Sequence, residues 1–151
     1  MIRHHQTKGM TAIEVIIAIA VLVILVTTIS VQFSDLRKNQ ALQAATTEVV
    51  SVLKKASSQT LASIDSSQYG VHFGTTAVII FKGTTYPSDS DETITLTSPV
   101  SISNVSLSGG GNAVYFERLT GKPNKTGTVT ISISGASKII TIGATGIISS
   151  N

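Results

Sequence analysis

A single apolar run near the N-terminus limits what this chain can fold into. Residues 10–31 read MTAIEVIIAIAVLVILVTTISV, and Glu14 is the only charged residue among them. A helix of that length extends roughly 33 Å at 1.5 Å per residue, which is close to the thickness of the hydrocarbon core of a bilayer. The run therefore predicts a transmembrane helix.

The nine residues before this run are polar and basic. Arg3 and Lys8 carry positive charge, and no acidic residue accompanies them. This asymmetry predicts a cytoplasmic N-terminus and a translocated remainder. Three interpretations compete: an unprocessed signal anchor, a segment that is cut before its apolar run, and a secretory signal peptide, which lacks a convincing cut site after Val26.

The residues KGMTAIEV, from Lys8 to Val15, resemble the type III signal of type IV prepilins and of type II secretion pseudopilins. The resemblance implies that a prepilin peptidase cuts between Gly9 and Met10 and that the new amine of Met10 is methylated. It also implies that Glu14 pairs with the N-terminus of a neighbouring subunit. Two residues depart from the usual pattern, because Met10 replaces Phe and Ala12 replaces Leu.

The position of Glu14 has a physical meaning of its own. An ionised carboxylate in the core of a bilayer costs several kcal/mol unless it is paired. Cleavage after Gly9 would create a partner, the amine of Met10. Alternatively, Glu14 lies at interface depth and favours the dipole at the start of the helix. Both explanations can hold together.

The apolar pattern continues beyond the run with helical spacing. No Gly or Pro occurs between Gly9 and Gly70, so one helix from about residue 11 to about residue 64 is expected. Its apolar residues recur every three or four positions and predict a face that packs on a domain. These residues are Ile29, Phe33, Leu36, Ala45, Val49, Val52, Leu53, Ala56, Leu61 and Ile64. A coiled-coil seam is the alternative, although the spacing is too irregular for sustained heptads.

From Tyr69 the period of the apolar residues changes to two. Short β-branched or aromatic runs alternate with Gly, Pro, Ser and Asp, as in a series of strands, and SGAS between two of the runs predicts a hairpin turn. The runs are YGVHF, TAVIIF, ETITLT, VSISNVSL, AVYFE, TVTISI, KIITI and TGIIS. YGVHF and the later VYFERLTGKP resemble the head of H-type minor pseudopilins and FimT-like proteins.

The expected fold class is α+β. A long N-terminal helix, with a transmembrane half and an amphipathic half, packs on an antiparallel β-rich head, and the resemblance implies the type IV pilin fold. The expected divisions are a cleaved leader (1–9), the transmembrane half (10–31), the amphipathic half packed on the head (32–65) and the β-rich globular head (66–151).

The charge of the chain does not indicate a nucleic-acid-binding protein. The net charge is +3, but removal of Arg3 and Lys8 leaves nine basic against eight acidic residues, a balance of +1. Cysteine is absent, which excludes a disulfide framework, a thiolate nucleophile and a Cys-based zinc site.

Two charged clusters are candidate binding sites in the head. Asp89, Asp91 and Glu92 form an acidic loop that could bind Ca²⁺, as in some pseudopilins, although a solvated loop is the simpler explanation. Arg118, Lys122 and Lys125 could contact DNA phosphates, as in some FimT-like proteins. Those proteins use an arginine-rich C-terminal motif, whereas this chain ends in KIITIGATGIISSN without arginine.

No catalytic constellation is visible, so an enzyme is not expected. His72 is the only histidine after the leader, and Gly109–Gly111 lacks the Lys-Ser/Thr of a phosphate loop. Asn104 and Asn124 match the glycosylation sequon, a pattern too common to indicate a function.

The resemblance implies a structural subunit, a minor pilin or pseudopilin, of a type II secretion or type IV pilus-like filament. The alternative is a DNA-binding minor pilin of a DNA-uptake system. The expected partners are a prepilin peptidase, other pilin or pseudopilin subunits, the inner-membrane assembly platform and membrane lipid, with no cofactor. The expected location is the cytoplasmic membrane, in a single pass with the N-terminus cytoplasmic and the head extracytoplasmic, followed by the assembled filament.

Overall fold

The first element is the helix α1 (Ala12–Leu61). The computed structural model describes residues 9–151, except for the side chains of residues 28–33. The sequence of this helix contains neither Gly nor Pro. The helix ends two residues before Ser63, whose φ of 51° is left-handed and not helical. A short 3₁₀ turn, η1 (Ile64–Ser66), leads into the first strand.

The expected transmembrane half over 10–31 is wrong. Where side chains are described, at 9–27 and 34–151, no helical segment has both the length and the apolar character needed to cross a membrane. The expected single-pass location in the cytoplasmic membrane depends on such a helix and is therefore also wrong. Residues 28–31 of the expected span lie outside the described side chains.

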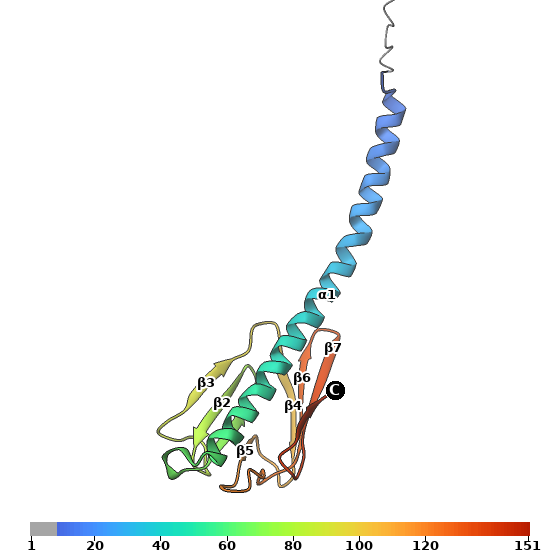
Figure 1. Cartoon of the computed structure of the whole chain (residues 1–151). Helices are drawn as coiled ribbons and strands as arrows, with labels where there is room; N and C mark the ends of the chain where they lie inside the picture. Colours follow the sequence, from blue (N-terminus) through green and yellow to red (C-terminus); the bar gives the residue numbers. More distant parts are fainter. Residues whose placement is uncertain (1–8) are drawn as a thin grey trace, which may run out of the picture. The chain divides into compact units, whose positions relative to one another are not determined.

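Eight strands follow and form two antiparallel sheets of four strands each (Figure 1). The strands of the first sheet lie in the order β3 (Glu92–Thr95), β2 (Ala77–Lys82), β1 (Tyr69–Phe73) and β5 (Ala113–Tyr115). Those of the second lie in the order β4 (Ser101–Leu107), β6 (Gly127–Ile133), β7 (Ala136–Ile142) and β8 (Ile148–Ser150). Strand β5 returns to the first sheet after β4 has begun the second, so the two sheets are interleaved along the chain.

The expected fold class, a long membrane-anchored helix on one β-rich head as in type IV pilins, is therefore wrong. The described chain after α1 is β-rich and divides into two sheets. The division into two sheets results from the strand pairing. Strand β4 pairs with β6 and not with β3, and β5 pairs with β1. Alternating apolar residues show which faces are buried, but they do not say which strands are neighbours.

The expected hairpin at SGAS is confirmed. Strands β6 and β7 pair from Gly127–Ile142 to Ile133–Ala136, so Ser134 and Gly135 form a two-residue connection. Gly135 has a φ of 86°, a left-handed value that glycine adopts without steric cost and that such tight hairpins require.

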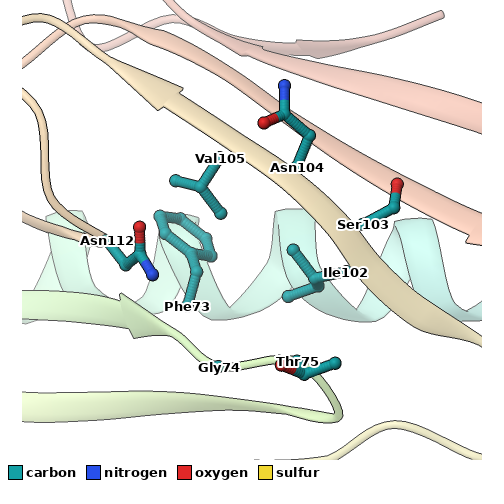
Figure 2. Close-up of a pocket in the computed structure, with 8 residues that line it drawn as sticks. All are labelled: Phe73, Gly74, Thr75, Ile102, Ser103, Asn104, Val105 and Asn112. Atoms are coloured by element: carbon teal, nitrogen blue, oxygen red, sulfur yellow. The ribbon is translucent and has the colours of Figure 1, made fainter.

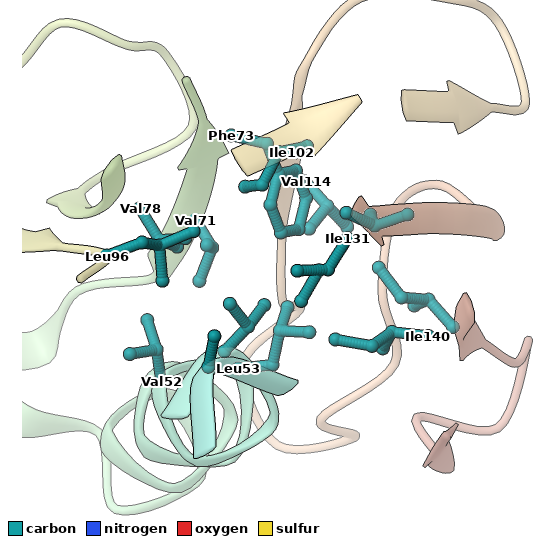
Figure 3. Packing of buried hydrophobic residues seen from close by; sticks show 14 of the residues in the cluster. Val52, Leu53, Val71, Phe73, Val78, Leu96, Ile102, Val114, Ile131 and Ile140 are labelled. Atoms are coloured by element: carbon teal, nitrogen blue, oxygen red, sulfur yellow. The ribbon is translucent and has the colours of Figure 1, made fainter. Parts of the chain in front are cut away.

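One hydrophobic core joins both sheets to part of α1. In Figure 3, Val52 and Leu53 of α1 meet side chains from the first sheet and from the second. The labelled members include Phe73 of β1 and Ile131 of β6, and Leu53 and Ile131 are completely buried. Each sheet therefore buries one face against the other sheet and the helix.

The chain divides into two compact units, Met1–Arg37 and Lys38–Asn151. Within the second unit, burial is confirmed for five residues of the expected helical face, namely Ala45, Val49, Val52, Leu53 and Ala56. Burial is wrong for Leu36, Leu61 and Ile64, which are 56%, 50% and 42% exposed. Leu36 belongs to the first unit, and Leu61 and Ile64 lie at and beyond the end of the helix. Ile29 and Phe33 lie outside the described side chains.

Candidate processing and assembly site

The expected cut site lies in the described chain just before α1. Gly9 and Met10 precede the first helical residue, Ala12. A Cβ atom added to Gly9 would meet no other atom within 4 Å, and Met10 is 69% exposed. The peptide bond between them is therefore accessible, and its chain is not held in a helix. Arg3 and Lys8 of the expected leader lie outside the described residues.

Glu14 lies in the first turn of α1 and is exposed. Its backbone N–H donates to the carbonyl oxygen of Thr11 at 3.1 Å, as does the N–H of Val15 at 3.3 Å. A carboxylate in this turn interacts favourably with the positive end of the helix dipole. Within the described part of the chain, Glu14 forms no ion pair. Its charge is thus available to a group from another molecule.

The helix that follows exposes many large apolar side chains. Twelve of them, between Met10 and Val26, are at least 40% exposed. They are Met10, Ile13, Val15, Ile16, Ile17, Ile19, Val21, Leu22, Val23, Ile24, Leu25 and Val26. Burial of one such side chain contributes about 1.5–3 kcal/mol. Such a dense apolar surface indicates a segment that is covered by another molecule.

The acidic loop does not gather its carboxylates around one point. Glu92 is paired with Lys55 Nζ at 2.7 Å. Asp91 accepts the hydroxyl hydrogen bond of Ser88 at 2.6 Å. Asp89 lines an open pocket together with Ser88 and Ser90. Over residues 9–151, no three acidic or histidine side chains are placed to hold a metal ion.

Two of the three basic residues of the expected DNA contact bond backbone carbonyl oxygens of this chain. Arg118 donates from Nη1 to the carbonyl oxygen of Ser66 at 2.8 Å. Lys125 donates from Nζ to the carbonyl oxygen of Gly110 at 2.6 Å. Lys122 is exposed. Two of the three cations thus hold loops in place.

His72 takes part in an aromatic contact that the sequence did not indicate. Its ring stacks on Tyr86 with centroids 4.0 Å apart and planes 8° from parallel. Tyr86 also contacts Phe81 in a tilted arrangement at 5.9 Å. Burial lowers the pKa of His72 below its usual 6.5, and the nearby Asp91 carboxylate opposes this shift. This arrangement holds the loop after β2 on the sheet.

An open pocket of about 280 Å³ lies where β4 approaches the β1–β2 turn (Figure 2). A bulge in β4 between Ile102 and Asn104 shapes one wall. None of its lining side chains is charged, so it offers no acid–base pair for catalysis. The lining residues are Phe73, Gly74, Thr75, Ile102, Ser103, Asn104, Val105 and Asn112.

Sequence reasoning missed a second exposed apolar surface, which we call the end cluster. It consists of Leu61, Ile64, Leu119 and Ile147, all exposed. The segments that carry them meet at Gly121: a Cβ there would lie 3.1 Å from the Leu61 side chain, and its carbonyl oxygen lies against Gly146. The sequence did contain one signal for this surface. Leu119 lies between Arg118 and Thr120 in a turn-like segment, where a large apolar residue is not part of a strand or helix that could bury it.

No protein family, no curated protein and no solved structure matches this chain.

Proposed function

We propose that this protein is a structural filament subunit that is cut after Gly9 and N-methylated at Met10 before it assembles. This is the role of minor pilins and pseudopilins in type II secretion and type IV pilus-like machines. The observation that carries the proposal is the adjacency of an accessible Gly9–Met10 bond to twelve exposed apolar side chains. In an assembly, these side chains would be covered by the same segments of other subunits.

Glu14 has a defined part in this proposal. Once the bond is cut, the methylated amine of Met10 is a cation, and Glu14 is the only charged residue among residues 10–31. Pairing of the two groups between neighbouring subunits would fix the position of one subunit along the next. A carboxylate left without a partner in an apolar contact would be strongly unfavourable.

The DNA-binding alternative has less support, and an enzymatic function has none. Arg118 and Lys125 are used to hold loops through backbone carbonyl oxygens. The described side chains present no cluster of titratable groups around the pocket in Figure 2.

Intact-mass analysis in cells with an active prepilin peptidase tests the proposal. The wild-type chain should begin at methylated Met10. Gly9→Leu should remain uncut, while Gly9→Ala should be cut at least in part. Because no atom lies within 4 Å of a Cβ at Gly9, neither change should disturb the fold. A mature chain that starts at residue 1 or after Val26 would refute the proposal.

A second test separates processing from assembly. Glu14→Val should be cut normally, since the cut site is unchanged, but should fail to enter a filament, while Glu14→Asp should be intermediate. Shearing of cells followed by quantification of released filament would measure this. Normal assembly of Glu14→Val would remove the carboxylate from the mechanism.

A further inference from the structure

The open pocket in Figure 2 lies along the outer edge of strand β4. This strand pairs with β6 on one side and, in the part of the chain that the structure describes, with no strand on the other. An edge strand carries backbone N–H and C=O groups that its own sheet does not pair. The hydrogen bonds at the two ends of β4 show which residue presents these groups to the pocket.

The backbone of Val105 is directed toward this outer edge. At the end of β4, Ser108 donates its N–H to the carbonyl oxygen of Thr126, just before β6, at 2.7 Å. Residues of an antiparallel pair direct their backbone groups alternately toward and away from the neighbouring strand. Val105, three residues before Ser108, therefore directs both its N–H and its C=O away from β6.

The bulge in β4 provides an independent check of this direction. Ile102 donates its N–H to the carbonyl oxygen of Thr75, outside the sheet, at 2.8 Å. Ile102 and Ser108 are an even number of residues apart, so a regular strand would direct both toward the same side. The extra residue at Ser103, where the register shifts, reverses the alternation and accounts for both bonds.

The outer edge of β4 is closed at both ends and open between them. Thr75 occupies the N–H of Ile102 at one end, and the N–H of Gly110 donates to the carbonyl oxygen of Leu107 at 2.9 Å at the other. The open stretch is about three residues long, or roughly 10 Å of extended chain. Within residues 9–151, the outward N–H and C=O of Val105 have no backbone partner. The pocket therefore contains a donor and an acceptor side by side.

The accessible side chains around these groups are polar and uncharged. Phe73 and Ile102 line the pocket but are only 1% and 6% exposed, so they form its floor. Thr75, Asn104 and Asn112 are exposed around it. Such a lining can bond neutral groups, whereas a charged side chain would find no counter-ion there.

We propose that this pocket binds a short, extended and uncharged peptide segment, which pairs with the outer edge of β4 through the backbone groups of Val105. An adjacent donor and acceptor on a strand edge are the groups that an added strand completes with its own C=O and N–H. The lining side chains restrict the segment to small, neutral residues. This binding site is additional to the proposed filament role and does not depend on it.

Titration with a neutral tripeptide tests the proposal. Full chains labelled with ¹⁵N, in mild detergent, receive acetyl-Ser-Val-Ser-amide. The amide signals of Val105 and Leu107 should shift and saturate at millimolar peptide. The same tripeptide with its backbone nitrogens methylated keeps the side chains but loses the donors, and should bind at least about fivefold more weakly. No shift at about 10 mM peptide, or equal binding of the methylated peptide, would overturn the proposal.

Proline variants test the direction of the backbone groups. Val105→Pro removes an N–H that faces the pocket, while Val105→Ala keeps this N–H and controls for the lost side chain. Binding should be lost with proline and kept with alanine. Asn104→Pro removes an N–H that faces β6 and should lower the melting temperature more than Val105→Pro does. Equal loss of stability in the two proline variants, or peptide binding by folded Val105→Pro, would contradict the proposal.

Two further additions identify the source of the segment and its chemical class. Unlabelled full chain, added without peptide, should shift the Val105 signal only if the segment comes from a second copy. If the signal moves with the tripeptide alone, the segment belongs to another protein. Glucose at the same concentration is the control for neutral hydrogen-bonding molecules. Shifts as large with glucose as with the tripeptide would refute a site for peptides.

Discussion

At the scale of single residues, the protonation of His72 makes the stability of the fold depend on pH. Its pKa is lowered by burial under Tyr86, so the folded chain holds the neutral ring more strongly than the unfolded chain does. The contribution to stability is therefore full above the unfolded pKa of about 6.5 and is lost as the pH falls from there through the folded pKa. We expect the free energy of unfolding to decrease over that interval.

Replacement of the imidazole tests this assignment. His72→Phe keeps an aromatic ring against Tyr86 but cannot bind a proton. Urea unfolding of the wild type should show lower stability at about pH 5 than at about pH 7.5, and His72→Phe should show a smaller difference. Equal pH dependence in the two proteins would mean that other groups cause it.

Gly70 is fixed by a close approach of an aromatic ring. It pairs with Phe81 across β1 and β2, and a Cβ added there would overlap the Phe81 ring. The ring is 1% exposed and packs against Tyr86, so it has little room to move. Gly70→Ala should destabilise the fold by about 1–3 kcal/mol.

A smaller partner should relieve this clash. In Gly70→Ala with Phe81→Leu, part of the lost stability should return, whereas the two changes should add if they act separately. Gly9→Ala is the control, because a Cβ there meets nothing. Thermal melts of the single and double variants measure the coupling.

The sequence predicted the burial of some single residues correctly and of others wrongly. Val49, Val52 and Leu53 were expected in the core because they repeat with helical spacing, and they are buried. Leu61 fits the same spacing but is exposed. The periodicity of apolar residues does not show where along a helix the packing against the sheets ends. The roles of Gly9, Met10 and Glu14 stay predictions, since they depend on molecules other than this chain.

At the scale of elements, Thr60 connects α1 to β1. It is completely buried; its hydroxyl donates to the carbonyl oxygen of Ala56 at 2.9 Å and accepts from the N–H of Tyr69 at 2.9 Å. Thr60→Val would leave that N–H buried and unpaired, at a cost of about 1–3 kcal/mol.

Thr46 offers a matched control within the same helix. It is 1% exposed, but its hydroxyl bonds only the carbonyl oxygen of Leu42, one turn earlier. Thr46→Val should therefore change the free energy of unfolding much less than Thr60→Val. Similar losses in urea unfolding would show that the contact with Tyr69 contributes little.

The strands show what local sequence can and cannot determine. Each of the eight β-branched or aromatic runs contains or overlaps a strand, from β1 at Tyr69–Phe73 to β8 at Ile148–Ser150. Their division into two sheets was not predicted, because pairing depends on contacts between segments far apart in the chain. The pairing of β1 with β5, across some forty intervening residues, is one example.

At the scale of the whole molecule, the part of α1 after Arg37 belongs to the core. Leu42, Val49 and Leu53 are buried with both sheets, within the unit Lys38–Asn151. A chain that starts at Lys38 should therefore fold and unfold cooperatively as a monomer. A chain that starts at Tyr69 should aggregate, because the faces that these side chains cover would be exposed.

Gel filtration and chemical unfolding of the two shortened chains measure this difference. A well-folded monomer from Tyr69 onward would show that the helix is dispensable for the two sheets. Aggregation of the chain from Lys38 would instead show that residues before it are needed.

The order in which strands alternate between sheets governs how this chain could be divided. Because β4 of the second sheet precedes β5 of the first, no single cut yields two fragments that each hold one complete sheet. Fragments split between β4 and β5, at Ser108–Asn112, would each lack a partner that only the other carries. During synthesis, β1 lacks its second neighbouring strand until Tyr115 has left the ribosome, and β4 is made before its partner β6.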